Sequence, residues 1–479
     1  MKKLLKKLNP NSFSQGNLPF LTKYLPFATM GGAAVIILSL AFGWLNVFFG
    51  GTITTAGQGF GYFSAPKSYL NLLAHLSPYN TWAYVENFDP HTSYALYLAH
   101  PAFSVFVASW FSFFAPWTSY WLFALFSIGV LAYCGYAIAG TTLDPLKKRL
   151  SYFLMICTFP AYWILFTGNI HAVFVLGITL IFVGVFYHTY GNDIRKANAT
   201  LLAGLLITLL TKPVALLMLP VLLLTRETRS AAIKGFAIYV VVSALFIVIP
   251  VLNPEGIGLS RLAHIAFDFD FVRQNMNIFQ NNLVVNEYMK DNSFHWLNLI
   301  AQSDFRYMGN NIFSFPVFLD TIAGSRLPSF IYQFPIFIGV GLSGVIPFMS
   351  GRKKRLETCL LLLFAISILY FIGYNTVWEY QFTSLFPVVA LLPVLSEKGV
   401  FYKRYVPLMF WLGAIVAFPS LFILAHLGHL SEGAVSTISR LDRIVPVYLL
   451  FWTMITPIIL IAKDLMGNSK QVPEIKFSR

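Results

Sequence analysis

The sequence predicts an all-α membrane protein, a polytopic bundle of about 11–13 transmembrane helices. The 479 residues are 57% hydrophobic and only 11% charged, whereas a soluble protein carries roughly a quarter charged residues. Apolar stretches long enough to cross a bilayer as helices recur along the whole chain. They are continuously apolar, whereas the strands of a membrane barrel alternate polar and apolar residues.

Each apolar stretch between polar segments is expected to be one helix. The predicted membrane segments are 29–50, 95–115, 117–141, 151–167, 171–190, 199–211, 213–225, 234–251, 329–350, 357–374, 383–396, 406–426 and 444–464. Segments 199–211 and 213–225 are short, and we expect them to form a hairpin broken at Lys212-Pro213, because proline interrupts a helix.

Two long stretches, 51–94 and 252–328, carry aromatic residues and charges of both signs. We expect both to be ordered extracytoplasmic loops. The predicted organisation is a basic N-terminal segment (1–28), a first helix (29–50), a first loop (51–94), helices over 95–251, a second loop (252–328), helices over 329–464 and a C-terminal tail (465–479).

The net charge of +14 does not indicate a nucleic-acid partner, because of where it lies. Short clusters between apolar stretches, together with the terminal segments, hold 23 of the 33 Lys and Arg but 6 of the 19 acids. This asymmetry is the positive-inside pattern of a protein surrounded by membrane lipids. We expect cytoplasmic termini and a bacterial or archaeal plasma membrane rather than the endoplasmic reticulum, although basic inner loops fit either.

The predicted sides of the membrane alternate consistently from residue 142 onward. Before that point they do not, because crossings by both 95–115 and 117–141 would place the basic cluster 146–150 outside. We expect that one of the two segments is not a full crossing, or that this cluster breaks the charge rule.

The sequence favours neither a metal centre nor a bound cofactor. Its three cysteines all fall inside apolar segments, which argues against a disulfide framework or a zinc site. Asp268 and Asp270 could serve a divalent cation, but two carboxylates without a third ligand also fit a solvated loop edge.

Polar residues interrupt the apolar pattern at 168–171, 212–213 and 375–381, all on the predicted outer side. Buried ionisable groups in a membrane are costly unless paired, so they are candidates for function. Asn169 and His171 would face a ligand or form a simple interfacial turn.

Lys212 lies at the predicted hairpin apex, where it could meet a lipid phosphate or extend toward the headgroups. Glu379, next to Trp378, Tyr380 and Gln381, could be the carboxylate of an aromatic-walled sugar site. Alternatively, Glu379 forms a salt bridge with Lys212 or with a loop arginine.

Four stretches resemble GT-C membrane glycosyltransferases of the polyprenol-phosphate-mannose-dependent branch. "SPYNTWAYVENFDP" with "AHPAFSVF" is similar to the family's Tyr-Pro-Pro entry into its second helix, and His100-Pro101 stands for Tyr-Pro. "TGNIHAVF" resembles its Gly-Gln-x-Asn turn, "LLTKPVALL" its Lys-Pro hairpin, and "NTVWEYQF" its Trp-x-His-His segment. The four occur in the family's order, over residues from about 60 to 395.

The resemblance implies a GT-C-type bundle that transfers a sugar from a lipid-phosphate donor on the outer side. An anionic leaving group needs a cation, the acceptor hydroxyl needs a general base, and negative charge stabilises an oxocarbenium-like transition state. The implied catalytic candidates are Asp89, Glu86 and Glu379; for the donor phosphate they are Lys212, Arg261 and Arg273; for the substrates they are His100, Asn169, His171, Trp378, Tyr380 and Gln381.

The chain departs from the family pattern at two places. The window "GYFSAPKSYLNLL", where the family has its catalytic aspartate, contains Lys67 and no acid, and Tyr380 and Gln381 replace the two histidines. Either Asp89, Glu86 or Glu379 has taken over as base, or the family reaction is lost. Asp89 also fits a turn, since Asp-Pro pairs are common turn formers.

The leading hypothesis is therefore a hexosyltransferase that moves a mannose-like sugar from a polyprenyl phosphate to a glycan, lipid or protein acceptor. The alternative is a catalytically inactive relative that serves as a structural subunit beside partner subunits of a membrane complex. A transporter ranks last, because the sequence shows neither midplane charges nor an internal repeat.

Overall fold

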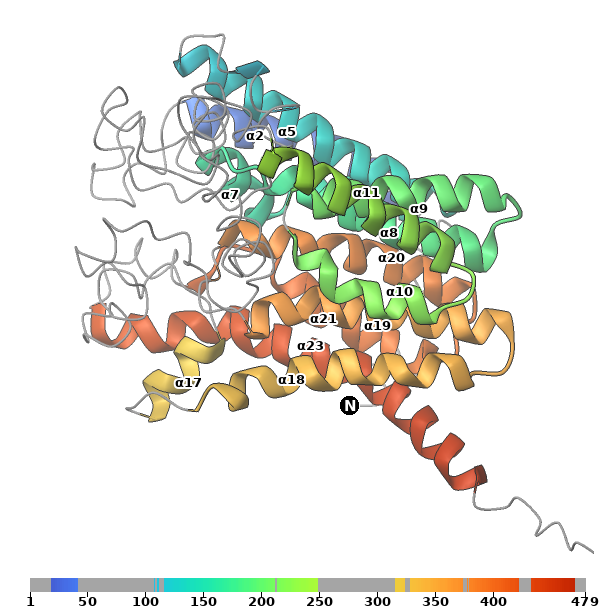
Figure 1. Cartoon of the computed structure of the whole chain (residues 1–479). Helices are drawn as coiled ribbons and strands as arrows, with labels where there is room; N and C mark the ends of the chain where they lie inside the picture. The colour runs from blue at the N-terminus through green and yellow to red at the C-terminus, as the bar shows by residue number, and fades with distance from the viewer. Residues whose placement is uncertain are drawn as a thin grey trace, which may run out of the picture.

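The computed structural model describes residues 19–41, 107, 110–111, 116–211, 213–248, 315–323, 328–373, 377, 379–421 and 432–469. These residues form helices joined by short turns, and no strand occurs among them. Figure 1 shows the helices packed alongside one another in a bundle. The predicted all-α class is confirmed for this part of the chain.

The described helices fall into two sets along the chain. The N-terminal set is α2 (Pro19–Ala41), α5 (Pro116–Ala139), α6 (Pro145–Ile156), α7 (Phe159–Thr167), α8 (His171–Tyr190), α9 (Ile194–Leu209), η7 (Pro213–Met218), α10 (Leu219–Leu224) and α11 (Arg229–Val248). The C-terminal set is α17 (Phe315–Ala323), α18 (Ser329–Gly341), η10 (Leu342–Phe348), α19 (Arg352–Gly373), η11 (Glu379–Leu385), α20 (Phe386–Glu397), η12 (Lys403–Tyr405), α21 (Val406–Ile415) and α23 (Glu432–Ser469).

Four helices in the described ranges, α2, α5, α8 and α23, are each long and apolar enough to cross a membrane. The pair α6 and α7 makes a fifth span if its bend of 41° is counted as a break within one crossing. Other apolar stretches are divided into shorter helices, as where α18 passes into η10. The structure therefore has the polytopic architecture that the composition predicts.

Several helices begin earlier than the apolar pattern predicted. Asp144 accepts a hydrogen bond from the Leu146 amide and Pro145 opens α6, so this crossing starts at 145 and not at 151. Asp193 caps α9 in the same way through the Lys196 amide. Helix α2 begins at Pro19, so part of the predicted N-terminal segment is helical. Caps and prolines, rather than hydropathy, place these starts.

The basic turns between helices gather at one end of the bundle, which we call the basic end. Near the start of α19, Glu357 accepts hydrogen bonds from the Tyr190 hydroxyl (2.8 Å) and from the Phe401 amide (3.2 Å). Lys147 at the start of α6 lies 2.9 Å from Glu397 at the end of α20. These contacts join four clusters that the positive-inside pattern predicted to share a side.

The opposite end of the bundle carries the polar notches Gly168–His171 and Glu379–Gln381, and we call it the notch end. Helix α2 runs parallel to α6, since Arg149 bonds the Thr22 carbonyl and the Cys157 thiol donates to the Thr29 carbonyl (3.3 Å). Leu40 near the C-terminus of α2 packs in one cluster with Phe166 and Trp121.

The end of α2 and the start of α5 therefore both lie at the notch end. From there α5 carries the chain to the basic end, where Lys147 of α6 lies. The predicted crossing 95–115 lies almost entirely outside the described residues.

Helices α8 and α9 approach each other closely along a seam of glycines. A Cβ added at Gly204 would lie 2.6 Å from the Ile181 nitrogen and 2.8 Å from the Gly177 oxygen, and one added at Gly184 would meet Leu201. Small residues at such interfaces let two backbones touch, which supplies the packing that holds membrane helices together.

We predict that Gly204→Ala lowers the free energy of unfolding by about 1–3 kcal/mol, because the methyl group meets backbone atoms that cannot yield locally. Thermal or SDS unfolding of the purified protein would measure this. Gly129→Ala in α5 is the control, since nothing lies within 4 Å of its added Cβ. Equal effects of the two substitutions would contradict a tight α8–α9 seam.

At the basic end, Arg355 binds Glu227 through both carboxylate oxygens, with its Nε 3.1 Å from Oε2. Burial raises the pKa of Glu227, but the hydrogen bonds and charge from Arg355 outweigh it and hold that pKa below its ordinary 4.5. A lowered carboxyl pKa contributes stability above pH 4.5, and this contribution disappears as pH falls through the folded-state pKa.

We predict that Glu227→Gln lowers the midpoint of thermal unfolding at pH 6. The difference from the unmodified protein should shrink as pH falls below about 4.5, because protonation then removes the same charge from Glu227. Melting curves between pH 6 and 3.5 test this. A difference that stays constant over this range would show that the carboxylate charge does not stabilise the fold.

Candidate functional site

The polar notch at 168–171 is a turn that ends α7 and starts α8. Gly168 adopts φ 58°, a left-handed conformation that suits glycine after a helix. The Asn169 amide donates to the Ile164 carbonyl (3.0 Å), and the Asn169 side-chain oxygen accepts from the His171 amide (3.0 Å). Gly168 and Asn169 therefore allow the chain to turn sharply from α7 into α8.

His171 joins this turn to the segment 379–381, which is 210 residues away in sequence. Its side chain is fully buried, and Nε2 donates to the Gln381 carbonyl at 3.1 Å, since a carbonyl only accepts. The imidazole meets the Tyr380 ring edge to face, with centroids 5.4 Å apart. The Tyr380 hydroxyl is hydrogen-bonded to the Asn169 side chain. The structure thus brings four of the predicted substrate-binding residues together.

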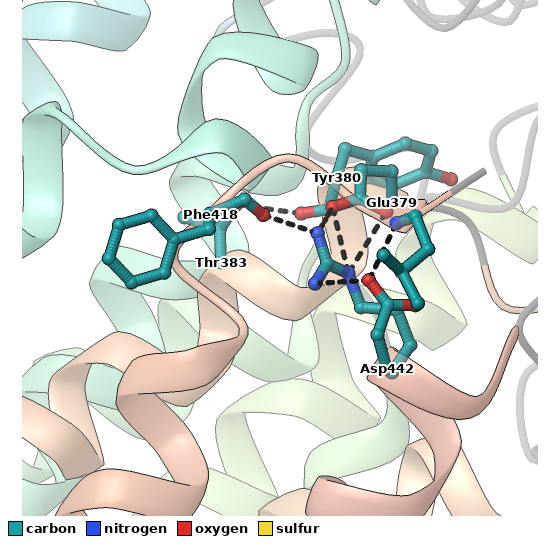
Figure 2. A network of polar contacts seen from close by, with 7 residues as sticks. Glu379, Tyr380, Thr383, Phe418 and Asp442 are labelled. Carbon is teal, nitrogen blue, oxygen red and sulfur yellow. Dashed lines mark hydrogen bonds and ion pairs between the residues drawn. The ribbon is translucent and has the colours of Figure 1, made fainter. Parts of the chain in front are cut away.

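The adjacent Glu379 forms a buried ion pair with Arg443 of α23. The Arg443 Nε lies 3.0 and 3.2 Å from the two carboxylate oxygens, and Nη2 lies 2.5 Å from Oε1. Glu379 is 3% exposed and Arg443 is 1% exposed. Nη2 also donates to the Phe418 carbonyl at 2.6 Å, as seen in the network of Figure 2.

Asp442 is the second acid of this network. Its Oδ2 accepts from the Leu421 amide (2.8 Å) and from the Arg443 Nη1 (3.3 Å). Its Oδ1 is buried without a hydrogen-bond partner among the described residues. The three side chains formally carry one positive and two negative charges, so a carboxylate charge remains unbalanced within the network.

Asp442 and Arg443 are not among the site residues predicted from the sequence. Their sequence signal is "RLDRIVP", a charged cluster that runs directly into the last apolar stretch. Charges at the edge of an apolar stretch usually lie at the membrane surface, whereas the side chain of Arg443 is buried in the bundle. Helix α23 begins at Glu432, twelve residues before the predicted 444, and so carries Arg443 within the helix.

Glu379 was predicted either as a catalytic base or as a salt-bridge partner of Lys212 or a loop arginine. The observed pairing favours the salt bridge, with an arginine that the sequence analysis did not name. A general base must reach the proton that it removes, and both oxygens of Glu379 are held by Arg443.

Other predicted site residues lie outside the part of the chain that the structure describes, and their roles stay predictions. They are Glu86, Asp89, His100, Lys212, Arg261, Asp268, Asp270, Arg273 and Trp378. The residues on either side of Lys212 place it where the chain reverses between α9 and η7. Among the described residues, no group of three His, Cys, Asp or Glu could hold a metal ion.

A known family model matches part of the chain. Residues 97–285 match the family model of Glycosyltransferase family 87, a GT-C-type family of membrane glycosyltransferases. The predicted resemblance is confirmed. No curated protein and no solved structure matches the chain. The family match indicates an integral membrane glycosyltransferase that acts on a sugar donor and an acceptor. It includes the notch at 168–171 and ends before η11 and α23.

We predict that Asn169→Ala lowers the free energy of unfolding by about 0.5–2 kcal/mol, because the turn before α8 loses the hydrogen bond from the His171 amide and Tyr380 loses its partner. Asn192→Ala is the matched control, since Asn192 is exposed in the turn after α8 and should change stability by less than about 0.5 kcal/mol. SDS unfolding of both variants measures the difference. Similar losses would contradict a structural role for the Asn169 side chain.

Proposed function

We propose that this membrane glycosyltransferase transfers a mannose-like hexose from a polyprenyl-phosphate donor to an extracytoplasmic acceptor. The acceptor is a glycan, a lipid or a protein. The observation that carries the proposal is the family 87 match over residues 97–285, which includes the polar turn at the notch end. A lipid-linked donor suits an enzyme whose polar residues lie at one end of an apolar bundle.

The positive-inside rule makes the basic end cytoplasmic and the notch end extracytoplasmic. Helix α2 ends and α5 starts at the notch end. Helix α11 starts at the basic end with Arg229, and the Phe315 ring of α17 stacks on the Tyr448 ring of α23, with centroids 4.5 Å apart. We expect the two long loops, which contain Glu86, Asp89, Arg261 and Arg273, to face the same extracytoplasmic side.

The proposed step breaks the bond between the sugar C1 and the phosphate oxygen and forms a bond between C1 and the acceptor oxygen. A carboxylate takes the acceptor hydroxyl proton, and polyprenyl phosphate leaves with the bonding electrons. Lys212, Arg261 and Arg273 are the candidates to neutralise that phosphate. Because Arg443 holds Glu379, we assign the base to Asp89 or Glu86.

One observation favours a second candidate, an inactive relative that serves as a structural subunit. Tyr380 and Gln381 stand where the resemblance has its two histidines, and both are engaged in contacts with the start of α8. Such contacts suit a packed scaffold as well as the wall of a site. Only the catalytic hypothesis requires a carboxylate in the first long loop.

The base is either Asp89 or Glu86. We predict that the variant that removes it, Asp89→Asn or Glu86→Gln, lowers the rate of sugar transfer by about 10²–10⁴-fold. The assay follows radiolabelled hexose from polyprenyl phosphate into lipid, glycan and peptide acceptors. Asp464→Asn is the control, because Asp464 is exposed near the C-terminal end of α23. Full activity in both loop variants would exclude these residues as the base. Absence of turnover with every donor, in protein that co-purifies with a fixed partner, would support the structural subunit.

A further inference from the structure

We propose that Arg443 is a positioning residue for the transfer site: through Glu379 it holds the segment 379–381 against the start of α8. This inference rests on the proposed function, since it assigns Tyr380 and Gln381 to substrate binding. It makes the C-terminal helix α23, which lies beyond the family match, part of the support of the site.

The guanidinium of Arg443 joins three elements. It holds Glu379 of η11 through two nitrogens, the Phe418 carbonyl after α21 through Nη2, and its neighbour Asp442 on α23 through Nη1. The planar arginine fork satisfies all of them from one position. Figure 2 shows Glu379, Phe418 and Asp442 gathered around this network.

Burial makes this geometry difficult to change. At 1% and 3% exposure, neither charge of the pair reaches water, and separating buried partners leaves an uncompensated charge. A buried pair adds little net stability compared with apolar packing, but it penalises every arrangement that moves the partners apart. We infer that the pair selects one position of η11 relative to α23.

The same three residues are held from the other side by the start of α8. His171 donates to the Gln381 carbonyl, and Asn169 binds the Tyr380 hydroxyl. Within the segment, Thr383 donates to the Tyr380 carbonyl at 2.8 Å. Segment 379–381 is thus held between the start of α8, which lies in the family-matched part, and α23, and losing one of these contacts should displace Tyr380 and Gln381.

Displacement of binding residues weakens donor binding more than it slows the chemical step. We expect Glu379→Gln and Arg443→Met to raise the donor KM by about 10–100-fold, corresponding to the loss of one or two binding contacts, with kcat within about twofold of the unmodified enzyme. Arg443→Lys keeps the positive charge but not the planar fork of donors. Its donor KM should therefore lie between that of the unmodified enzyme and that of Arg443→Met. If Glu379 were the base, Glu379→Gln would instead lower kcat.

The matched control is Glu227→Gln, which breaks the Arg355–Glu227 pair at the basic end. That pair has the same two residue types and the same two-oxygen contact, but it lies away from the notch end. Hydrogen exchange followed by mass spectrometry gives a readout that needs no turnover. We expect faster exchange in peptides covering 379–385 for the Glu379 and Arg443 variants, and no change there for Glu227→Gln.

The inference is overturned if exchange of 379–385 is unchanged in both Glu379→Gln and Arg443→Lys, or if Glu227→Gln raises the donor KM equally. A kcat loss without a KM change in Glu379→Gln also overturns it. If the unmodified protein transfers no sugar, the proposed function fails, while the exchange experiment still decides whether Arg443 holds the segment. If Arg443→Met does not fold, Arg443→Lys and Glu379→Gln carry the comparison.

Discussion

Hydrocarbon offers no hydrogen-bond partners, so a polar group within the bundle is costly unless the protein itself supplies a partner. The interior threonines show how this is done. The hydroxyls of Thr179, Thr208 and Thr225 each donate to the carbonyl four residues earlier on their own helix. Groups too large or too charged for that solution gather at the two ends of the bundle, where turns supply partners or where opposite charges meet. The location of the candidate site follows from this constraint.

The two ends use the same pairing for different purposes. At the basic end, Arg355–Glu227 and Lys147–Glu397 fasten turns that join neighbouring helices. At the notch end, Arg443–Glu379 is more deeply buried and joins the polar segment 379–381 to a distant helix. That segment in turn contacts the turn that starts α8. The notch end is therefore a connected polar layer built from both halves of the chain.

The polar layer at the notch end includes the two positions at which the chain departs from the histidines of the GT-C pattern. The resemblance has two histidines where this chain has Tyr380 and Gln381, yet an imidazole is still present in the layer. His171, contributed by the α8 turn, contacts both of those residues. The structure therefore places an imidazole against the two positions at which the chain departs from the pattern.

The sequence by itself determined the membrane class, the grouping of basic turns, the polar notches and the GT-C resemblance, because hydropathy and charge asymmetry are local properties that a bilayer imposes directly. It did not locate the starts of α6 and α9, which depend on capping by Asp144 and Asp193. Only the tertiary structure decided that Glu379 pairs with Arg443 and that His171 meets Gln381. Partners separated by 64 and 210 residues are chosen by how helices pack, and nothing in the local pattern around either residue specifies the other.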